Sequence, residues 1–113
     1  MPQEDSERAR RGLGRREYRR VRLITQVQCA ALGRKDELVT KDVSLGGLLI
    51  VTKKPYPTNS EIDVSFSLPF ADLPIFCRGQ VSYTVKGCGM GVRFLEMSEE
   101  SRLALKKFLA EAN

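Results

Sequence analysis

The sequence contains no histidine and no tryptophan, and it has only three cysteines. Without histidine, neither a Ser/His/Asp nor a Cys/His nucleophile can be assembled, and the commonest protein ligand of metal ions is missing. The cysteines, Cys29, Cys77 and Cys88, are odd in number and form no CxxC pair, so we interpret them as buried reduced thiols and expect neither a disulfide framework nor a zinc knuckle. We therefore expect a protein that is not an enzyme and carries no cofactor or metal.

Long apolar segments are missing as well. No window approaches the roughly 18 consecutive apolar residues of a membrane span, and the N-terminal stretch "MPQEDSERARRGLGRR" lacks the apolar middle of a secretory signal. A chain of 113 residues with 42% hydrophobic content is sufficient for one domain with a modest core. These features predict a cytoplasmic, single-domain protein that does not insert into membranes.

Positive charge is concentrated near the N-terminus. The formal net charge is +5, but residues 1–22 carry eight arginines against four acidic residues, and the rest of the chain is close to neutral. Five of these arginines fall within the nine residues "RREYRRVRL", residues 15–23. Such a segment is typical of a solvated arm, of a nonspecific contact with nucleic acid, or of a site for one small anionic ligand.

Short alternating segments bounded by turn residues indicate a protein built mainly of strands. The expected strands cover residues 21–32, 37–44, 48–54, 62–68, 75–83 and 92–94, the first of them irregular or bulged. The strictest alternation places Ile62, Val64, Phe66 and Leu68 on one face of a half-buried strand. In the strand at 75–83, four residues are predicted to share one face: Cys77, Gly79, Val81 and Tyr83.

Residues 98–112 are predicted to form an amphipathic helix, with Ser98 as its N-cap and acidic residues in its first turn. Its apolar stripe consists of Leu105, Phe108, Leu109 and Ala112. The stretches 33–37, 44–47 and 86–91 are predicted to be turns, and the paired glycines 46 and 47 would permit backbone angles closed to other residues. The predicted fold is therefore mostly β, a six-stranded antiparallel barrel whose end or flank is covered by a C-terminal α-helix.

Two short motifs give the arginine cluster a more specific interpretation. Arg16 and Arg20 form an RxxxR element, and Asp42, Ser44 and Gly47 form a DxSxxG element about twenty residues later. In this order, and followed by "GMGVRF" at residues 89–94, the motifs resemble those of the PilZ domain family of bacterial cyclic di-GMP receptors. Residues 1–14 have no hydrophobic period and are expected to be a flexible basic N-terminal arm, and the resemblance implies a PilZ-like domain at 15–113.

The resemblance implies that cyclic di-GMP binds at the barrel surface, with the arginine segment folding over it. An arginine fork can bind phosphate or the guanine O6/N7 edge, and the Asp42 carboxylate can accept from guanine N1 and N2. Judged without the arginines, Asp42 and Ser44 are also ordinary turn formers. The expected ligand-binding residues are Arg15, Arg16, Arg20, Asp42, Ser44, Gly46, Gly47, Tyr83 and Arg93.

Some of these residues carry a more particular expectation. In similar proteins an arginine at the position of Arg15 tends to accompany binding of two intercalated ligand molecules, whose four phosphodiester charges favour an additional cation. Tyr83 occupies a place where family members often have an aromatic near the ligand, and Arg93 could stack on a guanine, although both could equally be ordinary strand residues. Arg19 and Arg22 are expected to be solvated or auxiliary.

The function predicted from these features is that of a stand-alone second-messenger receptor. Ligand binding would order the arm and change the surface that is shown to an unidentified downstream protein. One alternative is an adaptor that binds proteins without any nucleotide, which the complete motif disfavours. The other is a nonspecific nucleic-acid binder, which the nearly neutral remainder of the chain and the lack of tryptophan disfavour.

Overall fold

The structure is a computed structural model that describes residues 19–112. Its elements, in chain order, are β1 (Val21–Arg22), β2 (Gln26–Ala31), β3 (Arg34–Val43), β4 (Gly47–Val51), β5 (Glu61–Phe66), β6 (Ile75–Val85), β7 (Gly89–Met97) and α1 (Glu99–Glu111). The predicted flexible arm at residues 1–14 lies outside the described residues, as do Arg15 and Arg16. No helix between residues 19 and 112 has the length and apolar content needed to span a membrane.

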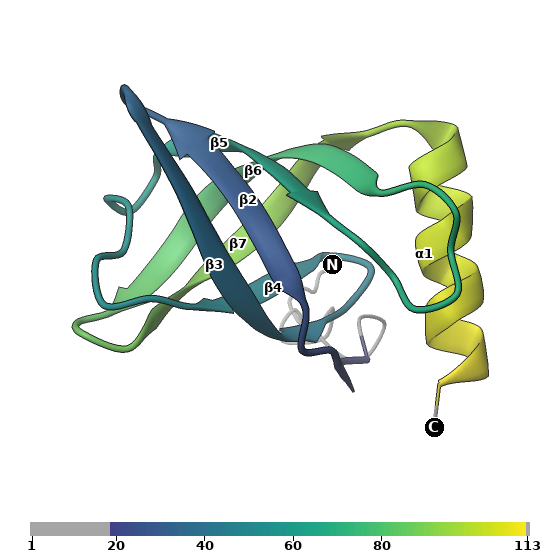
Figure 1. Ribbon diagram of the computed structural model, residues 1–113. Coiled ribbons are helices and arrows are strands. Elements are labelled where there is room, and N and C mark those ends of the chain that lie inside the picture. The colour runs from purple at the N-terminus through teal and green to yellow at the C-terminus, as the bar shows by residue number, and fades with distance from the viewer. Residues whose placement is uncertain (1–18, 113) are drawn as a thin grey trace, which may run out of the picture.

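Six antiparallel strands close into a barrel, with α1 standing beside it (Figure 1). The pairing runs β3, β2, β5, β6, β7 and β4, and β4 pairs back onto β3. One edge of β3 pairs first with β2 and then with β1, so β1 and β2 are a single strand interrupted at residues 23–25. This arrangement confirms the predicted mostly β barrel with a C-terminal helix, and it confirms the irregular first strand.

The interior of the barrel is formed by the inward-facing residues of each strand. Ile62, Val64, Phe66 and Leu68 are each at most 5% exposed, as their alternation predicts. Helix α1 is capped by Ser98, whose Oγ accepts a hydrogen bond from the Ser101 amide at 3.0 Å. Of its predicted apolar stripe, Leu105 is fully buried, whereas Phe108 and Leu109 are partly buried against the core. The helix is therefore attached to the barrel through a narrow face.

The turn regions differ from the sequence prediction in two places. Residues 86–91 were expected to be a turn followed by a short strand, but the turn occupies only 86–88 and β7 begins at Gly89. The turn expected at 33–37 is a two-residue loop of Leu32 and Gly33, with φ values of 56° and 74°. Two successive positive φ values match the twist of a tight hairpin, so β3 begins earlier than its polar residues suggest.

The loop between β4 and β5, which contains Tyr56, runs on the side of the barrel away from α1 (Figure 1). The Tyr56 side chain is fully buried, and its hydroxyl donates to Asp36 Oδ2 at 2.7 Å. The Arg34 guanidinium lies over the ring, 4.0 Å from its centroid. Burial raises the pKa of Tyr56, and its hydrogen bond lowers the pKa of Asp36, so the pair stays a neutral donor and an ionised acceptor.

The three cysteines do not share one environment, which corrects the expectation that all are buried. Cys29 and Cys77 lie in the core on either side of Val64, whereas Cys88 is exposed in the turn before β7. Burial raises the pKa of both Cys29 and Cys77 to about 12. Since the thiolate is the reactive form of cysteine, both core thiols are inert in the folded protein.

We expect a thiol-reactive maleimide at neutral pH to label one cysteine per folded chain rapidly, and all three after denaturation. Cys88→Ser should abolish the rapid phase. After denaturation, the maleimide should still label Cys29 and Cys77 of this variant. Rapid labelling of three thiols in the native protein would contradict the burial of Cys29 and Cys77.

Candidate functional site

Asp42 reaches the outside of the barrel because β3 contains a bulge. Thr40 pairs with Ile50 and Asp42 pairs with Leu49, which leaves Lys41 as an extra residue. In a regular strand, with Lys41 paired like its neighbours, Thr40 and Asp42 would point toward the same face. Instead Thr40 is 1% exposed and points inward, while the Asp42 side chain is 22% exposed. The bulge therefore redirects the motif carboxylate to the outer surface.

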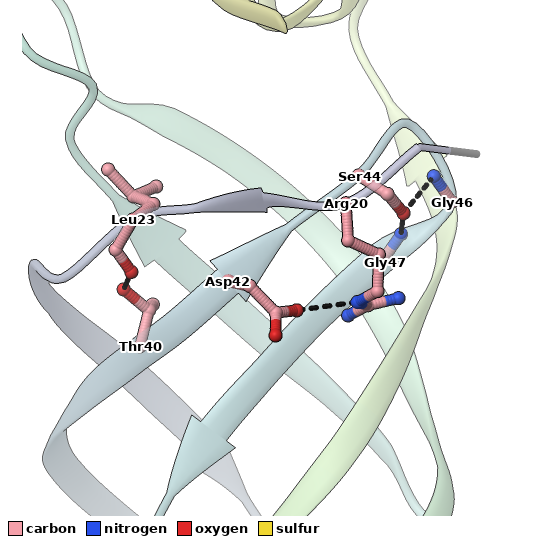
Figure 2. Close-up of polar contacts among 7 residues, drawn as sticks. All are labelled: Arg20, Leu23, Thr40, Asp42, Ser44, Gly46 and Gly47. Carbon is pink, nitrogen blue, oxygen red and sulfur yellow. Dashed lines mark hydrogen bonds and ion pairs between the residues drawn. The ribbon is translucent and has the colours of Figure 1, made fainter. Parts of the chain in front are cut away.

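Arg20 and Asp42 meet on this outer surface, although they are far apart in sequence. Arg20 Nε donates to Asp42 Oδ1 at 2.5 Å, and Figure 2 shows the two side chains directed toward each other. The Arg20 side chain is 47% exposed, so solvent screens the pair and its contribution to stability is small. Its main effect is geometric, because it brings one residue from each motif together.

Thr40 attaches the segment that carries Arg20 to the barrel. Its Oγ1 donates to the Leu23 carbonyl oxygen at 2.5 Å (Figure 2) and accepts from the Thr25 amide at 3.0 Å. These bonds satisfy the Leu23 carbonyl and the Thr25 amide at the interruption between β1 and β2, while the Leu23 amide and the Thr25 carbonyl bond to the backbone of β3. The sequence analysis did not identify Thr40, since a threonine within a strand carries no signal of such a role.

Ser44 holds the loop between β3 and β4 in shape. The side chain is 1% exposed, and its Oγ accepts from the Gly46 amide at 3.0 Å and from the Gly47 amide at 3.2 Å (Figure 2). The Ser44 amide donates to the Gly47 carbonyl oxygen at 2.9 Å. The local role that the sequence suggested for Ser44 is present, and the hydroxyl oxygen is engaged with the loop backbone.

Gly47 is required by the close approach of two strands. A Cβ atom at this position would lie 2.1 Å from the carbonyl oxygen of Val92 on β7. Gly46 and Gly47 do not adopt positive φ, so the loop does not use the left-handed backbone angles that paired glycines permit. The Phe94 amide also donates to the Gly46 carbonyl oxygen at 2.9 Å, so the loop is fixed to β7.

Tyr83 faces outward, which corrects its predicted place on the same face as Val81. Val81 pairs with Val92 and Tyr83 pairs with Gly91, so Ser82 is an extra residue and a second bulge redirects the side chain. The ring is 48% exposed and covers Gly91, where an added Cβ would lie 2.2 Å from Tyr83 Cε1. An exposed aromatic ring is thus held flat against the barrel.

These residues surround a groove of about 470 Å³ on the outside of β4, β6 and β7. Its lining residues are Arg20, Ser44, Leu45, Gly46, Gly47, Leu48, Ser82, Tyr83, Gly91, Val92, Arg93, Phe94 and Arg102. The lining has three arginines and no acidic residue. Arg93 is exposed, and its Nη2 donates to the neutral side chain of Gln80 at 2.6 Å. The groove is therefore suited to an anionic ligand with a planar group.

A larger groove, of about 1150 Å³, is lined by residues of β2, β3 and β5 and by the ends of β6 and β7. Four acidic residues line it, Asp36, Glu37, Asp63 and Glu96, against two cations, Lys35 and Arg102. This excess of negative charge repels phosphates. We therefore assign the functional site by charge and chemistry to the smaller groove, which also contains the motif residues.

Arg19 has a role that the sequence analysis did not predict. Its Nη2 donates to the carbonyl oxygens of Leu109 at 2.9 Å and Ala112 at 2.8 Å, at the C-terminal end of α1. The last turn of this helix has no basic residue of its own, so Arg19 supplies the cation that the helix dipole favours there. The absence of a basic residue from the last turn of α1 was the sequence signal that could have indicated this role for Arg19. Arg19 is exposed, which agrees with the expectation of a solvated residue, but it is also bound to the end of the helix.

Comparison with known proteins gives consistent results. The profile of the PilZ domain matches residues 14–111. The inhibitor of motility from Bacillus subtilis (MotI/DgrA) superimposes with a TM-score of 0.72 at 17% identity, over 87% of this chain and 51% of that one. The PilZ domain of YcgR from Escherichia coli with c-di-GMP gives a TM-score of 0.67 at 14% identity, over 85% of this chain and 90% of that one.

PlzA from Borreliella burgdorferi, solved in complex with c-di-GMP, gives a TM-score of 0.64 at 19% identity, over 91% of this chain and 44% of that one. This chain therefore spans about half the length of the Bacillus protein and less than half of PlzA. Identities this low show a shared fold. No curated protein matches the sequence.

We expect Gly47→Ala to destabilise the folded protein by about 2 kcal/mol, because the new methyl group overlaps the backbone oxygen of Val92, which cannot move without disrupting the β4–β7 pairing. Urea denaturation followed by circular dichroism measures this change. Gly33→Asn is the control, since nothing lies within 4 Å of an added Cβ there and asparagine tolerates a φ of 74°. Equal stability of the two variants would contradict the close contact.

Proposed function

The chain belongs to the PilZ domain family, and on that premise we propose that it is a receptor for cyclic di-GMP, which binds in the groove between the Ser44–Gly47 loop and Tyr83. The observation that carries the proposal is the groove itself, whose lining contains three arginines and no acidic residue. The Arg20–Asp42 pair lies at its edge. The c-di-GMP complexes of YcgR and PlzA, which share the fold, support the choice of ligand.

The Arg20–Asp42 pair is suited to bind the ligand without being broken. The contact uses only Nε of Arg20 and Oδ1 of Asp42. The two Nη groups of Arg20 can therefore donate to a phosphate or to the O6/N7 edge of a guanine. Oδ2 of Asp42 can accept from guanine N1 and N2. The pair orients both groups before the ligand arrives, which lowers the entropy lost on binding.

Tyr83 and Arg93 supply the remaining features of the groove. The exposed Tyr83 ring offers a flat apolar surface on which a guanine can stack, an interaction of about 1–3 kcal/mol. Arg93 lies beside Gly47 in the strand pairing, within the same lining, where its guanidinium can contact a phosphodiester. Ser44, Gly46 and Gly47 serve by holding the loop in a fixed shape against β7.

The proposed mechanism is that of a binding module without catalysis. Arg15 and Arg16 precede the described residues and would reach the ligand from the N-terminal segment, which becomes ordered as phosphates neutralise its arginines. This ordering would change the surface available to a downstream protein. Binding of two intercalated ligands, as the position of Arg15 implies, stays a prediction, and the end point of a calorimetric titration measures it.

We expect isothermal titration to show saturable binding of cyclic di-GMP, with Arg16→Ala and Arg20→Ala each weakening the affinity about 10- to 100-fold. Loss of a charge-assisted contact typically costs ~1.5–3 kcal/mol, which corresponds to this range. Arg78→Ala is the matched control, because Arg78 is an exposed arginine paired with Glu61 and does not line the groove. Wild-type affinity in both motif variants would rule out the proposed site.

We expect Asp42→Ala to weaken binding of cyclic di-GMP but not of random single-stranded DNA. A carboxylate that reads a guanine edge is needed only for the specific ligand, and it repels a phosphate backbone. Titrations of both ligands at two salt concentrations separate these cases. Tight DNA binding that is indifferent to Asp42 and falls steeply with salt would instead favour the nucleic-acid alternative.

A further inference from the structure

Arg102 is a cation near the N-terminal end of α1, where the helix dipole does not stabilise positive charge. It lies in the first turns of α1, directly after Glu99, Glu100 and Ser101, and its amide donates to the Ser98 carbonyl oxygen at 2.9 Å. The N-terminal end of a helix carries partial positive charge, which stabilises acidic residues and destabilises a cation. Arg102 follows the first turn, so the helix dipole does not stabilise its charge, and the last turn of α1 has no basic residue.

The Arg102 side chain lines the groove proposed above, and it also lines one edge of the larger, acidic groove. It lines the proposed groove together with Arg20, Arg93 and the Gly46–Gly47 backbone, although it belongs to the helix and not to the barrel. Within residues 19–112, the ion pairs are Arg20–Asp42, Arg34–Asp36 and Arg78–Glu61, so no described carboxylate pairs with Arg102. Even Glu99, one helical turn earlier, forms no ion pair with it. Its guanidinium is thus available to an external anion.

A cation that lines a groove with two other arginines, gains no support from its helix dipole and has no described partner points to a function. We propose that Arg102 is a further ligand-binding residue, which contacts a phosphodiester of the bound ligand from α1 and so joins the helix to the Ser44–Gly47 loop. This inference rests on the proposed function of the groove. It adds a contact from outside the two sequence motifs.

The contact would give the ligand control over the docking of α1. Only Ser101 and Leu105 of the helix are buried, so its attachment to the barrel is limited. Arg19, the neighbour of Arg20, already holds the C-terminal end of the helix through Leu109 and Ala112. A ligand that contacts both Arg20 and Arg102 would therefore be connected to the two ends of α1 at once, and would reduce local opening of the helix.

Arg102→Gln tests the proposal, since it removes the charge and keeps a polar side chain. We expect cyclic di-GMP to bind this variant roughly five- to twentyfold more weakly than wild type. The melting temperature of the free protein should not fall, because the helix loses a cation from its unfavourable end. A purely structural role would lower stability and affinity together, so the two measurements separate the roles.

Lys107→Gln is the matched control, because it removes one positive charge from the same helix at a residue that lines a different groove, against the loop between β5 and β6. This control should bind the ligand as wild type does. Hydrogen exchange of the α1 amides provides a second readout: cyclic di-GMP should slow it in the wild type and in Lys107→Gln, and distinctly less in Arg102→Gln.

The outcomes distinguish this inference from the function on which it rests. If the wild type binds cyclic di-GMP and Arg20→Ala does not, but Arg102→Gln binds as tightly as Lys107→Gln, the role of Arg102 is excluded and the receptor function stands. If the wild type does not bind cyclic di-GMP at all, both are excluded. Weak binding by Arg102→Gln together with an unchanged melting temperature supports the proposal.

Discussion

The bulge at Lys41 is the constraint on which the site depends. By adding one residue to β3 opposite β4, it directs Thr40 and Val43 inward and Asp42 outward. Thr40 can then bind the backbone of Leu23 and Thr25 from inside the barrel, while Asp42 pairs with Arg20 on the outer surface. One irregularity in one strand therefore fixes both the segment that carries Arg20 and the carboxylate that it meets.

The groove combines a rigid floor with a more lightly held edge. Its floor is backbone, because Gly47 packs directly against the Val92 carbonyl and the Ser44 hydroxyl occupies the amides of Gly46 and Gly47. The segment before β1 is held by a few polar contacts, with Arg19 on the helix and Arg20 on Asp42. A ligand can therefore bind to a preformed floor and still shift the segment before β1, which forms the edge of the groove.

Charge, more than volume, distinguishes the candidate site from the rest of the surface. The larger groove carries four acidic side chains, whereas the smaller one carries three arginines, contributed by the segment before β1, by β7 and by α1. Asp42 pairs with only one of these cations, Arg20, and no described carboxylate pairs with Arg93 or Arg102, so mutual repulsion of the three disfavours the free protein. An anionic ligand relieves that repulsion, which is a physical reason for the binding free energy to be concentrated there.

The sequence by itself determined the kind of fold and which residues form the two motifs. Alternation at Ile62, Val64, Phe66 and Leu68, the Ser98 cap and the spacing of Arg20, Asp42 and Ser44 are local properties, and local properties can be read along the chain. The apolar face of α1 was predictable for the same reason, since helical periodicity decides it.

Only the tertiary structure decided which way several of these side chains point and what surrounds them. Tyr83 was predicted to face the core because strict alternation places it with Val81, but the bulge at Ser82 exists only in the pairing with β7. The need for glycine at position 47 comes from Val92, and the roles of Arg19 and Arg102 come from how α1 lies relative to the barrel. These contacts join residues that are distant in sequence, and the registers and packing that create them have no signature in any single segment.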